Sequence, residues 1–276
     1  MSGVRVVADT ASDLSPAMAA EYGIDLVPLT VRFGAEEFAD LSPADFWSRL
    51  ATSSTLPETA APSPGAFEET YRKAAAGGAE GVVCVTISSA LSATYEAARL
   101  AAESVAGTIP VRVVDSRAVS MGEGTVAVVA AELAAAGRSL DDVAAGAAAM
   151  VPRTRTFAAL DTLDNLRKGG RIGAAQALLG SMLSIKPIIE VAGGKVEPES
   201  KQRTRAKSLR YLADKVRQAA PVERLTVLHG GAPDVDVLLD LLAGVCPRDQ
   251  IAVADVGAVI GTHAGPRVIG VTFAVP

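Results

Sequence analysis

The stretch that decides the fold runs from Gly81 to Ala102 and reads GVVCVTISSALSATYEAARLAA. Its first part, Val82 to Ile87, is an unbroken apolar run rich in β-branched residues, which is typical of a parallel strand buried on both faces. From Leu91 onward, apolar residues recur at the spacing of one helical face. A buried strand followed by an amphipathic helix is the repeating unit of an α/β protein with a parallel sheet.

Two serines, Ser88 and Ser89, stand where this strand gives way to the expected helix. The first turn of a helix leaves backbone N–H groups without intrahelical partners, and the helix dipole adds positive charge there. Such a turn favours a carboxylate or phosphate, so the serines are candidate contacts for an anion. The simpler alternative is that one serine only caps the helix.

Strands and helices alternate on either side of this stretch. The expected strands of the first half are Val4–Ala8, Ile24–Phe33 and Val111–Asp115, and the expected helices begin at Pro16, within Ser42–Asp45 and at Gly65, with a long one over Gly124–Ala136. The segment Leu56–Pro64 contains three prolines, which predict an extended loop without regular structure. The alternation predicts a doubly wound parallel sheet in the N-terminal half.

The second half has a different pattern. Its expected strands are Thr156–Leu160, Pro187–Val191, Leu225–His229, Ile251–Val256 and Val268–Val275, and its expected helices run through Ala177 and Leu179 to near Ser184, over Thr204–Ala219 and over Leu238–Ala243. Between two of the strands, Gly193-Gly194 is typical of a tight hairpin turn. We therefore expect two α/β domains, residues 1–151 with a parallel sheet and residues 152–276 with a mixed sheet.

Composition limits the classes of function. The formal net charge of −5 argues against a nucleic-acid-binding protein. Residues 153–217 nevertheless hold fourteen Lys and Arg against six Asp and Glu, so an anionic ligand or partner is expected to meet this part. Cys84 and Cys246 lack metal-site spacing, and the expected burial of Cys84 fits a reducing, cytoplasmic setting. No apolar run reaches the length of a membrane span, and no cleavable leader is expected.

Hydroxyl and imidazole groups occur in three expected loops that are distant in the sequence. Thr59 lies among prolines, Ser88 and Ser89 follow the central strand, and His263 lies in a glycine-containing loop before the last strand. Each has an ordinary explanation when taken alone, as a turn threonine, a capping serine and a surface histidine.

Six short motifs extend over the chain from end to end. They are DTASDL at Asp9–Leu14, TAAPSP at Thr59–Pro64, ISSALSATY at Ile87–Tyr95, KGGRI at Lys168–Ile172, IKPI at Ile185–Ile188 and IGTHAGP at Ile260–Pro266. In this order they resemble the DegV family of bacterial fatty acid-binding proteins.

The resemblance implies a two-domain α/β protein that holds one long-chain fatty acid in an apolar tunnel at the domain junction. It implies that the chain is not an enzyme and needs no cofactor or metal. The bound acid is instead presented to a separate ATP-dependent fatty acid kinase subunit, which makes the acyl phosphate. Transient proximity to a membrane is compatible with this role, and nucleic acid has no part in it.

The resemblance also assigns roles to individual residues. Thr59 is expected to hydrogen-bond the carboxylate together with Ser88 or Ser89, and we slightly favour Ser89. His263 is expected near the head group, where a charged or donating imidazole would balance the carboxylate. The basic residues that the resemblance puts near the head group or on a kinase-docking face are Arg171, Arg203 and Arg205.

Four positions depart from the family pattern. Ala60-Ala61 stand where Ser-Gln is frequent, and Ala93 stands where glycine is usual, and we expect both to affect mainly the surroundings of the direct contacts. Arg267 stands where glycine usually follows the final Gly-Pro. We expect this cation either to alter the His263 loop or to add charge to the head-group site, which bears on how a kinase would be engaged.

Two other classes of function stay open. In a hydrolase, Ser89 would be the nucleophile and His263 the base, with Asp9 or Asp255 orienting the base. The chain contains neither a G-x-S-x-G elbow nor a G-x-x-x-x-G-K-[S/T] phosphate loop. A lipid-binding sensor or regulator would need no kinase partner. Turnover of an acyl substrate by the isolated chain would favour the hydrolase, whereas acyl phosphate formation only with a second protein would favour the carrier.

Overall fold

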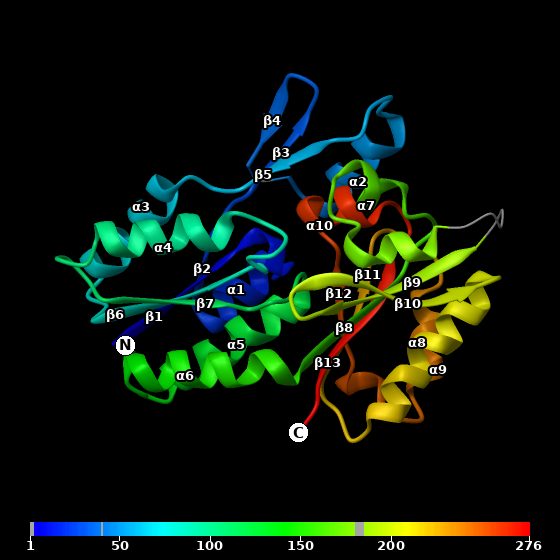
Figure 1. Ribbon diagram of the computed structural model, residues 1–276. Helices are drawn as coiled ribbons and strands as arrows, with labels where there is room; N and C mark the ends of the chain where they lie inside the picture. Colours follow the sequence, from blue (N-terminus) through cyan, green and yellow to red (C-terminus); the bar gives the residue numbers. More distant parts are fainter. Residues whose placement is uncertain (1–2, 40, 180–184) are drawn as a thin grey trace. The chain divides into compact units, whose positions relative to one another are not determined.

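The computed structural model describes residues 3–39, 41–179 and 185–276. The chain divides into two compact units, Met1–Thr30 with Thr59–Pro152 and Val31–Glu58 with Arg153–Pro276 (Figure 1). Residues 31–58 thus group with the C-terminal half, which the sequence pattern did not suggest. The domain limits expected above, 1–151 and 152–276, remain a prediction.

In the first unit, a sheet of four parallel strands has the order β2-β1-β6-β7. The strands are β1 (Val4–Asp9), β2 (Ile24–Val27), β6 (Gly81–Thr86) and β7 (Val111–Asp115). Every residue of β6 is buried, as the apolar run from Val82 onward predicted. The parallel sheet expected for the N-terminal half is confirmed.

Helices cover both faces of this sheet (Figure 1). One face carries α3 (Pro64–Ala76) and α4 (Thr94–Ser104), and the other carries α1 (Pro16–Tyr22), α5 (Met121–Ala135) and α6 (Leu140–Met150). On the first face, Phe67 and Tyr71 of α3 pack with Ala98 of α4 against Val82 and Cys84 of β6. The doubly wound arrangement is therefore confirmed.

The second unit contains a mixed sheet of six strands in the order β10-β9-β8-β13-β11-β12. The strands are β8 (Thr154–Ala159), β9 (Lys186–Ala192), β10 (Lys195–Gln202), β11 (Glu223–His229), β12 (Ala252–Asp255) and β13 (Ile269–Ala274). Only β11 and β12 pair in parallel, and the other neighbours are antiparallel. Gly193 and Gly194 have φ angles of +58° and +83° in the turn between β9 and β10, so the predicted Gly-Gly hairpin is confirmed.

The helices of this unit are α2 (Pro43–Thr52), α7 (Asp164–Lys168), α8 (Arg205–Ala219), α9 (Val235–Leu242) and α10 (Ala258–Ala264). The apolar stripe of α8, formed by Leu209, Leu212 and Val216, packs with Phe157 of β8 and Val271 of β13. This stripe matches the predicted amphipathic helix. None of the described helices has the length and hydropathy that crossing a membrane requires.

Two local predictions were wrong. Within the expected loop Leu56–Pro64, Glu58–Ala60 form a short strand, β5, because the prolines flank these residues and do not interrupt them. β5 belongs to a small sheet of order β4-β3-β5, with β3 (Thr30–Phe33) and β4 (Glu36–Phe38). The expected helix through Ala177 is instead a 3₁₀ segment, Gly173–Leu178, and its expected end near Ser184 lies outside the described residues.

Candidate ligand-binding site

The serine pair lies in a turn and not at the start of a helix. After β6, the carbonyl oxygen of Ser88 accepts hydrogen bonds from the backbone N–H groups of Leu91 and Ser92, at 3.0 and 3.1 Å. The helix α4 begins only at Thr94. The expectation that these serines begin or cap the helix is therefore wrong, and their role in binding an anion stays a prediction.

Ser88 is fully buried and held from several sides. Its backbone N–H donates to the carbonyl oxygen of Ala118, after β7, at 3.0 Å. Its Oγ accepts a hydrogen bond from the N–H of Ala90 at 3.3 Å. A ligand could therefore reach the Ser88 side chain only from inside the protein.

Ser89 has a different environment, although it is adjacent. It is exposed, and its Oγ donates to Asp115 Oδ2 at 2.5 Å while its backbone N–H donates to Asp115 Oδ1 at 3.1 Å. The carboxylate of Asp115 therefore already occupies both donors of Ser89. A second carboxylate at this position would meet like charge.

His263 lies in the last turn of α10 and not in a loop. The helix is placed against α7 by a hydrogen bond from Asn165 Nδ2 to the carbonyl oxygen of Thr262, at 3.0 Å. A Cβ on Gly169, directly after α7, would come within 2.4 Å of His263 Nδ1. The KGGRI motif thus leaves space for the imidazole ring.

Burial, and secondarily the positive charge of Arg171, lowers the pKa of His263 to about 4. The imidazole is consequently neutral at pH 7, so it can donate a hydrogen bond without carrying a charge. Arg171 is itself oriented by a hydrogen bond from Nη1 to the carbonyl oxygen of Gly169, at 2.8 Å. Of the two forms expected for His263, the structure favours the neutral donor, and Arg171 is the cation nearby.

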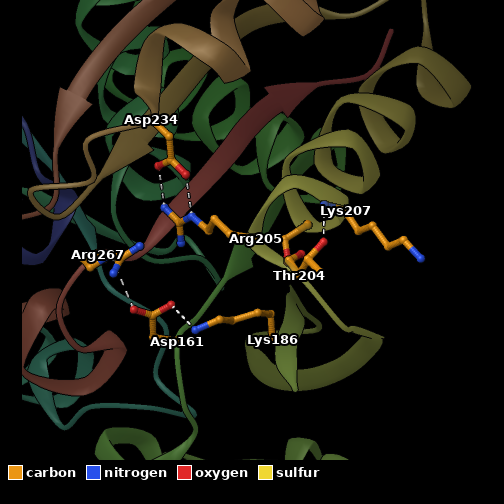
Figure 2. Close-up of polar contacts among 8 residues, drawn as sticks. Asp161, Lys186, Thr204, Arg205, Lys207, Asp234 and Arg267 are labelled. Atoms are coloured by element: carbon orange, nitrogen blue, oxygen red, sulfur yellow. Dashed lines mark hydrogen bonds and ion pairs between the residues drawn. The ribbon is translucent and has the colours of Figure 1, made fainter. Parts of the chain in front are cut away.

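Arg205, the first residue of α8, is engaged in a structural ion pair. Figure 2 shows its guanidinium facing Asp234, with Nε and Nη2 donating to the two carboxylate oxygens at 2.8 and 2.9 Å. The hydrogen bonds from Arg205 lower the pKa of Asp234. By contrast, Arg203 is exposed just before the helix.

Arg267 turns toward Asp161, whose carboxylate also pairs with Lys186 at 2.7 Å (Figure 2). The distance from Arg267 Nε to Asp161 Oδ2 is 3.6 Å. The backbone of Arg267 has a φ of +60°, a conformation that glycine adopts at lower cost. This angle explains why glycine suits the position, and the ion pair gives the cation a partner in Asp161.

The remaining predicted residue, Thr59, is half-buried in the middle of β5. Within the first unit, Ser88 and Ser89 share one turn. Within the second, Gly169 brings Arg171 and His263 together.

A cavity of about 600 Å³ opens in the first unit at the amino ends of the parallel strands. It is lined near the amino ends of β1, β2 and β6 by polar residues, among them Arg5, Asp25 and Glu80, and by alanines of α5. The turn that contains Ser88 and Ser89, here called the serine turn, follows the carboxyl end of β6. The cavity at the amino ends is therefore separate from the serine turn.

The sequence patterns assigned no role to Asp115 or Gly169, and Asp9 was considered only as the orienting acid of a hydrolase. Asp115 ends a predicted strand, and Asp9 and Gly169 lie inside the quoted motifs, which was the available signal. Among the described residues, no group of three or more His, Cys, Asp or Glu could hold a metal ion.

Comparison with known proteins gives a consistent match over nearly the whole chain. The sequence model of the DegV family, described as "Uncharacterised protein, DegV family", matches residues 3–275. A DegV domain-containing protein of Streptomyces coelicolor is 41% identical over 281 residues, which cover 97% of each chain.

Solved structures of the same family are similar in fold as well as in sequence. A structure described as the fatty acid binding of a DegV family protein from Thermus thermophilus is 31% identical, with a TM-score of 0.90 over 99% of each chain. A DegV family protein from Ruminococcus gnavus, described with vaccenic acid, is 25% identical, with a TM-score of 0.86 over 99% of this chain and 100% of that one.

Proposed function

This chain belongs to the DegV family, and from that premise we propose that it binds one long-chain fatty acid and is not itself an enzyme. The support for the ligand is that two relatives matched over nearly their whole length are described with fatty acid binding or with vaccenic acid. The proposal includes an apolar tunnel for the acyl chain, an ATP-dependent kinase as partner and a cytoplasmic location.

We assign the carboxylate to Thr59, Ser88 and His263, with Arg171 supplying positive charge. A carboxylate that leaves water needs several donors, and hydroxyl and imidazole N–H groups supply them. We prefer Ser88 to Ser89 because Ser88 is buried, whereas Ser89 is exposed and its hydroxyl lies against the carboxylate of Asp115. The buried side chain of Ser88, in a family with members described as fatty acid binding, is the observation that carries the proposal.

The acyl chain would supply most of the affinity. Each buried CH₂ group contributes roughly 0.8 kcal/mol, so a long chain gains far more than one hydrogen bond provides. With six Phe, four Tyr and one Trp among 276 residues, small aliphatic side chains make up most of the apolar content. Such side chains can line a tube without filling it.

The geometry of the described residues does not favour the hydrolase. The Oγ of Ser89 donates to a carboxylate, whereas a nucleophilic serine donates to the base that removes its proton. With a pKa lowered to about 4, His263 is a weaker base than an ordinary histidine.

The head-group assignment is tested by oleate binding, measured by competition with a fluorescent fatty acid. We expect Ser88→Ala to weaken binding about tenfold, and Thr59→Ala by a similar factor, because each removes a hydrogen bond to a charged group. Ser89→Ala is the matched control and should change affinity less than twofold. A loss confined to Ser89→Ala would contradict the assignment, and a wild-type chain that binds no fatty acid would contradict the proposed function.

The kinase partner needs a separate test. The oleate-loaded protein is incubated with ATP and hydroxylamine, which traps acyl phosphate as a hydroxamate, with or without a cell extract of the source organism. The carrier function predicts hydroxamate only when both the extract and the loaded protein are present. If the extract produces none, the result supports a sensor or regulator instead.

A further inference from the structure

The DTASDL motif builds a turn at the carboxyl end of β1 that reaches the serine turn. Asp9 is fully buried, and its Oδ1 accepts a hydrogen bond from the N–H of Ala11 at 2.9 Å. Its Oδ2 accepts one from the N–H of Ile87 at 2.8 Å. Since Ile87 immediately precedes Ser88, one carboxylate joins the end of β1 to the candidate site.

A second buried acid, Glu123, lies in the first turn of α5 beside Asp9. Both residues are completely buried, and neither oxygen of Glu123 has a hydrogen bond of regular geometry within the described residues. The turn after β1 is also bonded to the start of α5, because the N–H of Ser120 donates to the carbonyl oxygen of Ala11 at 2.8 Å. A Cβ on Gly124 would be 3.0 Å from the carbonyl oxygen of Ser12, so the two segments are in close contact.

The titratable groups around Asp9 are Glu123 on α5, Asp13 in its own turn and Cys84 on β6. Burial raises the pKa of Asp9 to about 6, and burial with the charges of Asp9 and Asp13 raises the pKa of Glu123 well above its usual value. Burial likewise raises the pKa of the Cys84 thiol. The interaction between the two side chains lowers the pKa of Asp9 and raises that of Glu123, so Glu123 is the partner that holds its proton to higher pH and can donate it to Asp9.

We propose that Asp9 is a positioning residue that fixes the Ile87–Ser88 segment for the fatty acid head group. This inference depends on the proposed function. A carboxylate suits the task because its two oxygens accept the N–H groups of Ala11 and Ile87 at the same time. An asparagine has one acceptor oxygen, so one of those N–H groups would face the amide NH₂.

The experiment compares Asp9→Asn with Asp13→Asn, its matched control in the same turn. Asp13 is also a buried acid, and its carboxylate accepts a hydrogen bond from Ser120 on the α5 side. Glu123→Gln keeps a donor beside Asp9 and serves as the conservative variant. The readouts are the oleate dissociation constant at pH 7.5, deuterium uptake of the peptide covering residues 87–92, and the thermal midpoint.

We expect Asp9→Asn to weaken oleate binding about tenfold and to speed deuterium uptake at residues 87–92, because a hydrogen bond to a charged group is lost. Asp13→Asn should change the oleate dissociation constant and the rate of deuterium uptake at residues 87–92 less than twofold, even if the thermal midpoint of this variant falls. Glu123→Gln should bind oleate like the wild type.

The inference is overturned if oleate binding depends on Ser88 but Asp9→Asn binds oleate normally, or if Asp13→Asn weakens binding equally. A wild-type chain without oleate affinity would instead contradict the proposed function, and the deuterium uptake would still report on the contact between Asp9 and Ile87. Should Asp9→Asn fail to fold, the wild-type amide proton shift of Ile87 is followed by NMR from pH 5 to 8. Movement of this shift as a carboxyl group titrates supports the contact, and rapid solvent exchange of the Ile87 amide proton overturns it.

Discussion

A Cβ added to Gly169 would lie 2.4 Å from Nδ1 of His263, so the imidazole ring rests directly on the glycine backbone. The same glycine offers its carbonyl oxygen to the guanidinium of Arg171, at 2.8 Å. One residue of the KGGRI motif therefore sets the positions of two side chains that we assign to the fatty acid head group.

Gly169→Ala should displace the imidazole and weaken oleate binding by about tenfold, which corresponds to the loss of one hydrogen bond to a charged group. The matched control is Gly244→Ala, because Gly244 belongs to the same unit and its Cβ would meet no atom within 4 Å. Competition binding measures both variants. Equal affinities for the two would show that the position of the ring is unimportant.

His263 should make the protein less stable in acid. Its pKa is lowered from 6.5 to about 4, so the unfolded chain binds more protons than the folded chain between these values. Stability is therefore retained above pH 6.5 and lost as the pH falls toward 4, by at most about 3 kcal/mol. The free energy of unfolding, measured with urea, should differ less between pH 7.5 and pH 4.5 for His263→Gln than for the wild type. The control is His229→Gln, and an equal reduction in that variant would refute the assignment.

Glu123 should have the opposite effect. Its pKa is raised in the folded protein, so the folded chain holds a proton that the unfolded chain releases, and stability falls as the pH rises above the unfolded value of about 4.3. Glu123→Gln removes this contribution to the pH dependence of the free energy of unfolding. The variant should therefore be more stable than the wild type at pH 8. The exposed Glu132 on the same helix provides the control Glu132→Gln, for which we expect an unchanged slope in urea unfolding.

The pair between Arg205 and Asp234 should contribute to stability and not to ligand binding. Only 15% and 19% of the two side chains are exposed, and the contact is bidentate. Removing one partner leaves a mostly buried charge, so Arg205→Ala should lower the free energy of unfolding by about 2 kcal/mol. Arg203→Ala, at an exposed position, should change it by less than about 0.5 kcal/mol. If Arg205→Ala instead weakened oleate binding at full stability, Arg205 would belong to the head-group site.

The elements that the sequence predicted best are those with a strong local signal. The apolar run from Val82 onward requires burial on both faces, and the stripe of Leu209, Leu212 and Val216 requires a helix with one buried side. Three helices begin with a serine cap followed by proline, at Ser15, Ser42 and Ser63. Each serine side chain accepts a hydrogen bond from a backbone N–H of the first turn, and proline has no N–H that would need a partner there. These helix starts therefore follow from local chemistry.

The candidate site was harder to predict because distant residues decide it. The helical spacing after Ser88 suggested an immediate helix, but bonds to Ala118 and Asp115, near the end of the next strand, hold this segment in a turn. Around His263, glycines suggested an open loop. Gly261 instead sits within α10, where its Cβ would lie 2.5 Å from the ring of Phe46, so glycine serves close packing with α2.

The most direct measurement is mass spectrometry of the protein purified without added lipid, under native conditions and after solvent extraction. The proposed function predicts a mass increase equal to one long-chain fatty acid per chain, and recovery of that acid in the extract. If the chain carries no fatty acid, and a purified, delipidated sample also fails to take up oleate or vaccenate, the function proposed for it is wrong.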